Sequence, residues 1–137
     1  MQMSASAAKK MKKNKYLVVF LLLLTFSQTV AYLFTNDETI INSRMFFGLL
    51  GSNTLSILIL FVFITALLLY FLKSTKKYKY PLIFVLSGTV SNLSDRIVFG
   101  GARDYIKFQY WPAFNLADTL IIAGILFFCY YFFSEKN

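Results

Sequence analysis

Four apolar stretches, each long enough to cross a lipid bilayer, constrain the fold of this chain more than any other feature. A helix needs about 20 mostly apolar residues, each rising ~1.5 Å, to span the hydrocarbon core. Such stretches lie at residues 16–34, 54–72, 81–99 and 114–133. Because 58% of the 137 residues are hydrophobic, the composition also fits a membrane protein. We expect an all-α membrane protein with four transmembrane helices.

The lysines predict how these helices are oriented. All of them except Lys107 precede the first stretch, separate the second from the third or follow the fourth, at positions 9, 10, 12, 13, 15, 73, 76, 77, 79 and 136. Since cytoplasmic loops are rich in Lys and Arg, both termini are expected in the cytoplasm. Residues 1–15 then form a basic cytoplasmic tail ahead of a four-span domain at 16–137. The net charge of +8 serves orientation and attraction to anionic lipid rather than binding of nucleic acid.

The N-terminus also allows a second interpretation, because a basic segment before an apolar run is typical of a secretory signal peptide. The first run is longer than the roughly 7–15 residues of such a peptide. No small-x-small cleavage site follows it. These features favour an uncleaved signal anchor. The segments on the far side of the membrane then form a small extracytoplasmic loop region, with room for short β-strands.

All the acidic residues except Glu135 gather on that extracytoplasmic side. Asp95, Asp104 and Asp118 lie inside or at the mouth of apolar stretches, where an ionisable group is costly and is therefore a functional candidate. Asn92 and Asn115 each precede an aspartate by three residues, a spacing that puts both side chains on one helical face. The alternative for Asn92 and Asp95 is a polar helix end near the lipid headgroups. The alternative for Asn115 and Asp118 is an ordinary helix cap.

Asp104 and Asp118 are expected to meet. Gly100 and Gly101 allow a tight turn after the third stretch, and only fourteen positions separate the two aspartates. Two close carboxyl groups in a poorly solvated site share a proton. One can then act as a base toward water while the other donates a hydrogen bond and later a proton. This chemistry needs no metal, cofactor or histidine, and the chain contains no histidine.

Four blocks of the sequence, taken together, resemble those of a known family. Residues 87–96, SGTVSNLSDR, are similar to a GGAxGNxxDR block, and residues 103–106, RDYI, are similar to VDFI. Residues 114–118, FNLAD, are similar to FNxAD, and residues 42–48, NSRMFFG, to an NxGxAFG loop. These blocks and their order along the chain resemble those of the lipoprotein signal peptidases (signal peptidase II). The resemblance runs from the first span to the C-terminus.

The resemblance implies a multi-pass aspartic peptidase of the bacterial inner membrane. It implies that Asp104 and Asp118 are the catalytic pair, facing the extracytoplasmic side under the loop region. The implied supporting or substrate-binding residues are Asn42, Asn92, Arg96 and Asn115, and Asp95 is implied to be structural. The implied activity is removal of the signal peptide from diacylglyceryl-modified prolipoproteins just before the lipidated cysteine. The enzyme would act as a monomer surrounded by membrane lipid, without a cofactor.

The chain also departs from the family pattern, most clearly in the first span. The departures are Ser27 and Ala31 in place of Asp and Lys, Arg44 and Met45 in place of Gly and Ala, and Ser87 and Ser91 in place of glycines. The missing charges keep open a non-catalytic relative that binds lipoproteins or a membrane partner. The aspartates near the membrane keep open a small transporter with proton or cation sites.

Overall fold

The elements of the chain follow its apolar stretches closely. The computed structural model describes residues 5–43 and 53–135, and only the backbone of residues 5–14 and 53. Within these ranges lie four helices long and apolar enough to cross a membrane, α1 (Ala5–Phe34), α2 (Asn53–Lys73), α3 (Lys76–Phe99) and α4 (Leu116–Ser134). Four short strands are β1 (Ile40–Asn42), β2 (Ala102–Asp104), β3 (Ile106–Phe108) and β4 (Trp111–Phe114). The predicted helical fold with four candidate membrane-spanning helices is confirmed.

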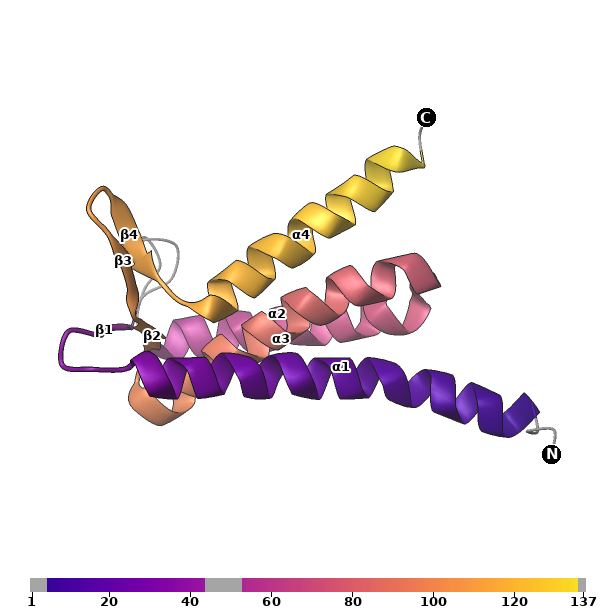
Figure 1. Ribbon diagram of the computed structural model, residues 1–137, viewed down its shortest axis with the longest axis horizontal. Coiled ribbons are helices and arrows are strands. Elements are labelled where there is room, and N and C mark those ends of the chain that lie inside the picture. Colours follow the sequence, from indigo (N-terminus) through magenta and orange to yellow (C-terminus); the bar gives the residue numbers. More distant parts are fainter. Residues whose placement is uncertain (1–4, 44–52, 136–137) are drawn as a thin grey trace.

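All four strands lie at one end of the molecule, called here the strand end (Figure 1). β1 pairs antiparallel with β2, with Asn42 opposite Ala102, and β3 and β4 form a second antiparallel pair. Helix α1 begins and helix α4 ends at the opposite end of the molecule (Figure 1). The segments that were expected to form an extracytoplasmic loop region therefore share one end.

Helix α3 is the centre of the bundle, because it packs against each of the other three helices. Its buried residues run along most of its length, whereas large apolar side chains on the other helices point outward. Leu22, Phe61 and Leu126 are 63%, 64% and 64% exposed, respectively. Apolar surface of this kind suits contact with lipid chains rather than with water, as expected of a multi-pass membrane protein.

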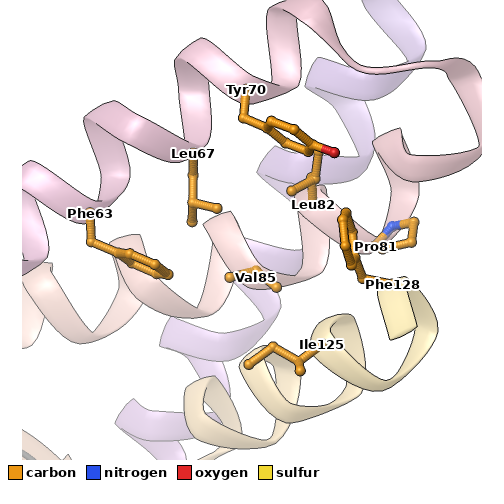
Figure 2. A pocket seen from close by; sticks show the side chains of 8 residues that line it. All are labelled: Phe63, Leu67, Tyr70, Pro81, Leu82, Val85, Ile125 and Phe128. Atoms are coloured by element: carbon orange, nitrogen blue, oxygen red, sulfur yellow. The ribbon is translucent and has the colours of Figure 1, made fainter. Parts of the chain in front are cut away.

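Helix α3 begins earlier than predicted, at Lys76 rather than at Pro81. Proline lacks a backbone N–H and usually marks a helix boundary, which is why the sequence placed the start there. In the structure Pro81 is fully buried and lines an apolar pocket among α2, α3 and α4 (Figure 2). This packing offsets the loss of the backbone hydrogen bond that Pro81 cannot donate. The helix therefore includes the lysines at 76, 77 and 79, which precede Pro81.

Two glycines let α3 and α4 approach each other closely. A Cβ atom on Gly88 would lie 2.3 Å from the carbonyl oxygen of Ala117, and one on Gly124 would lie 2.7 Å from the carbonyl oxygen of Pro81. Both distances are shorter than any normal contact of a carbon atom with an oxygen. The contact between the two helices therefore requires residues without a side chain at these two positions.

We predict that Gly88→Ala forces α3 and α4 apart and lowers the free energy of unfolding by about 1–3 kcal/mol, the usual effect of overpacking. Thermal unfolding of the purified protein in detergent measures this change. Ala66→Val, which adds carbon atoms at an exposed position of α2, is the control and should melt as the wild type does. A Gly88→Ala variant that also melts at the wild-type temperature would contradict the close contact.

Candidate active site

Asp104 and Asp118 enter the strand end from two different elements. Asp104 is the last residue of β2, and Asp118 lies in the first turn of α4. The chain leaves α3 through Gly100, whose φ of 77° is in the left-handed region that glycine adopts without steric cost. The tight turn predicted here is confirmed, and it returns β2 against α3.

Asn115 and Asp118 together form the N-terminal cap of α4. The side-chain oxygen of Asn115 accepts a hydrogen bond from the backbone N–H of Asp118 at 2.9 Å. In return, Oδ2 of Asp118 accepts from the backbone N–H of Asn115 at 3.2 Å, which completes a capping box. The ordinary cap expected from the sequence is therefore present. It uses one polar atom of each side chain and leaves the other available.

The remaining polar atoms join the two carboxyl groups through amides. Nδ2 of Asn115 donates to Oδ1 of Asp104 at 2.9 Å and to Oδ1 of Asn92 at 3.0 Å. Nδ2 of Asn92 in turn donates to Oδ1 of Asp118 at 2.8 Å. On the other side, Nδ2 of Asn42 donates to Oδ2 of Asp104 at 3.0 Å. These five residues form one connected set, called here the amide–carboxylate network.

Burial governs the protonation of Asp104, which is only 3% exposed. The pKa of Asp104 is raised to about 6, mainly by loss of hydration and further by the charge of Asp118. The hydrogen bonds from Asn42 and Asn115 and the charge of Arg96 oppose it, because each favours the ionised carboxylate. A carboxyl group with this pKa can gain and lose a proton near neutral pH, as a general acid or base must.

Asp95 and Arg96 are adjacent in sequence but reach in different directions. Nη1 of Arg96 donates to the backbone oxygen of Asn42 at 2.9 Å, beside the network. Asp95 instead forms a buried ion pair with Arg103, at 2.8 Å, a partner that the sequence did not indicate. Asn92, three residues before Asp95, bonds instead to Asn115 and Asp118 at the start of α4, so the two side chains, expected on one helical face, contact different elements.

The first span contributes polar contacts that the sequence pattern did not reveal. Nε2 of Gln28 donates to Oδ1 of Asp95 at 3.1 Å and to the backbone oxygen of Ser91 at 3.0 Å. The hydroxyl groups of Ser27 and Ser91 lie 2.9 Å apart. Polar residues inside an apolar stretch were the available signal for these contacts. The departures at Arg44 and Met45 lie outside the described residues.

Tyr105, which follows Asp104, ties this part of the chain to the start of α4. Its hydroxyl oxygen accepts a hydrogen bond from the backbone N–H of Leu116 at 3.1 Å. Its ring stacks on Phe34 of α1, with ring centres 6.1 Å apart. Tyrosine had no place in the expected site. Its contacts nevertheless fix both neighbours of the network, the end of β2 and the first residue of α4.

An apolar pocket lies along the helices next to the network. It has a volume of about 200 Å³, and its lining of aliphatic and aromatic side chains comes from α2, α3 and α4 (Figure 2). Val85 and Ile125 in this lining are seven residues from Asn92 and Asp118, respectively. Seven residues are two helical turns, or about 10 Å. The pocket therefore follows the same helix faces that carry the network.

The sequence comparisons lead to one family. The family model described as signal peptidase (SPase) II matches residues 6–134. A lipoprotein signal peptidase of Caldanaerobacter subterraneus subsp. tengcongensis is 32% identical over 121 residues, which cover 85% of this chain and 83% of that protein. Another, of Halothermothrix orenii, is 37% identical over 94 residues, which cover 66% of this chain and 65% of the relative, just under two thirds of its length.

A solved structure shares the fold. A bacterial membrane enzyme determined by the in meso method at 2.3 Å resolution superposes with a TM-score of 0.79, covering 90% of each chain. Its sequence identity to this chain is 18%, so the likeness concerns the fold alone. The helices and strands described above therefore follow an arrangement already known among membrane enzymes.

We predict that Asn115→Ser is more stable than Asn115→Ala by about 1 kcal/mol, the usual contribution of an N-cap side chain. Both variants lose the amide that reaches Asp104 and Asn92, but serine can still accept the hydrogen bond from the N–H of Asp118. Thermal unfolding of the two variants isolates the cap from the network. Identical melting of the two would show that the cap adds nothing to the stability of α4.

Proposed function

The chain belongs to the signal peptidase II family of aspartic membrane peptidases, and we propose that it cleaves the signal peptide from diacylglyceryl-modified bacterial prolipoproteins just before the lipidated cysteine. The observation that carries this proposal is the amide–carboxylate network. It brings two carboxyl groups from β2 and α4 into one connected set at the end of an apolar bundle. Asp104 and Asp118 are the proposed catalytic residues, and Asn42, Asn92, Arg96 and Asn115 support them.

In the proposed reaction the two carboxyl groups hold one proton between them. The ionised carboxylate takes a proton from water as the water oxygen bonds to the scissile carbonyl carbon. The protonated carboxyl group donates a hydrogen bond to the developing oxyanion, then its proton to the leaving amine as the C–N bond breaks. The signal peptide leaves with a new carboxyl terminus, the cysteine with a free amine, and the pair again holds one proton.

The amides keep the pair in a geometry suited to this exchange. Each carboxyl group accepts hydrogen bonds on both oxygens, Asp104 from Asn42 and Asn115, and Asp118 from Asn92 and the backbone of Asn115. Donors of this kind fix the orientation of a carboxylate and favour its ionised form. Burial acts in the opposite direction on Asp104, so that its proton affinity stays within reach of neutral pH.

The apolar surface of the bundle supports a substrate whose cleavage site follows a hydrophobic helix. The signal peptide lies along the pocket of α2, α3 and α4, which leads toward the network along Val85 and Ile125. The network faces the extracytoplasmic side of the bacterial inner membrane, and both termini are cytoplasmic. The lysine pattern and the position of all strands at one end (Figure 1) support this orientation. The enzyme acts as a monomer in contact with membrane lipid.

We predict that Asp104→Asn and Asp118→Asn each lower turnover by about 10²–10⁴-fold, the usual contribution of a general acid or base. Asparagine has almost the volume of aspartate but cannot exchange the proton. The measurement is gel mobility and product mass after incubation of purified protein with a diacylglyceryl-modified prolipoprotein. The same precursor without its lipid should remain uncut.

Asp37→Asn is the matched control, because it makes the same chemical change at an exposed acid of the strand end. This variant should cleave as fast as the wild type. Substantial turnover by folded Asp104→Asn or Asp118→Asn would remove that aspartate from the proposed pair. A wild-type protein that binds the lipidated precursor without cutting it would instead indicate the non-catalytic relative.

A further inference from the structure

We propose that Arg103 is a positioning residue, which sets the place of Asp104 by tying strand β2 to helices α1 and α3. The inference rests on the proposed function, because it assigns to Arg103 an effect on a proposed catalytic carboxyl group. Arg103 immediately precedes Asp104 and has no direct hydrogen bond to the network among those described. Its influence therefore passes through the backbone of β2.

The guanidinium group of Arg103 binds the carboxylate of Asp95 through two parallel hydrogen bonds. Nη2 donates to Oδ1 at 2.8 Å, and Nε donates to Oδ2 at 3.1 Å. The backbone N–H of Arg103 also donates to Oδ2 of Asp95, at 3.1 Å. One carboxylate on α3 thus holds both the side chain and the backbone of the residue next to Asp104. Both partners are buried, at 5% and 4% exposure.

Helix α1 closes this arrangement through Gln28. Nη2 of Arg103 donates to Oε1 of Gln28 at 2.8 Å. Nε2 of Gln28 donates to Oδ1 of Asp95 at 3.1 Å, the oxygen that also accepts from Nη2 of Arg103. The guanidinium carbon also lies 4.3 Å from the centre of the Phe99 ring. Residues of α1, α3 and β2 therefore meet at the guanidinium group of Arg103. Because this group is planar, its hydrogen bonds hold the three elements in one relative orientation.

The position of β2 decides whether Asp104 reaches its partners. The amides that bind Asp104 come from β1, which is paired with β2, and from the cap of α4, so a shift of β2 relative to α4 would change the hydrogen bond between Asn115 and Asp104. A buried ion pair is weak evidence for stability, because desolvation offsets its attraction. Fixed geometry is the more consequential effect here, since a displacement of about 1 Å can reduce the rate of a reaction about 100-fold.

Arg103→Lys tests this role, because lysine keeps the charge but cannot form the two parallel hydrogen bonds. We expect kcat to fall about 10-fold to 100-fold while KM for the lipidated prolipoprotein stays close to the wild-type value. A second variant, Asp95→Asn with Arg103→Gln, removes both charges, so that neither is left buried alone. It should fold and show a similarly reduced kcat. Lys107→Gln, which removes an exposed cation in β3, is the control and should leave both constants unchanged.

The results separate this inference from the proposed function. Wild-type kcat in both folded Arg103 variants would overturn the positioning role while leaving the peptidase activity intact. A change confined to KM would place Arg103 in contact with substrate, and failure of both variants to fold would make its role purely structural; either result overturns the inference. Absence of cleavage by the wild-type protein would overturn the proposed function itself, and this role with it.

Discussion

Hydrogen bonds from three asparagine amides to two carboxyl groups hold the strand end of this molecule together. A buried carboxylate is costly unless donors compensate for its lost water, and here Asn42, Asn92 and Asn115 supply them. The same amides come from β1, α3 and the cap of α4, so that satisfying the carboxylates also fixes these elements relative to one another. Loss of any one amide would therefore affect both the charge balance and the architecture of the site.

The close contact between α3 and α4 makes such short side chains sufficient. Gly88 lies one helical turn from Asn92, and the backbone of Ala117, next to Asp118, occupies the space where a side chain at position 88 would be. Asparagine has a reach of only a few atoms, and at a wider helix spacing its amide would fall short of Asp118. Gly88 lets the two helices approach, and Asn92 depends on that approach to reach Asp118.

The parts that the sequence predicted are those set by local rules. Bilayer thickness fixes the length of the apolar stretches. The glycine turn and the short separation of Asp104 from Asp118 indicated that both aspartates reach one end of the bundle, where Asn115 bonds to both. The pairing of β1 with β2 joins three-residue strands from distant segments, which carry too few residues to specify a partner. Asp95 reaches Arg103 because β2 folds back against α3, and the spacing of residues along the chain does not predict that contact.

A carbon-13 NMR titration of the aspartate carboxyl groups would show whether Asp104 and Asp118 behave as one ionising pair, as proposed. The chain has only four aspartates, so single substitutions suffice to assign the signals. We expect Asp104 to titrate with a pKa of about 6 and this pKa to fall in Asp118→Asn, where the neighbouring negative charge is gone. A pKa near the ordinary value of about 3.9, or one unchanged by Asp118→Asn, would contradict the proposed pair.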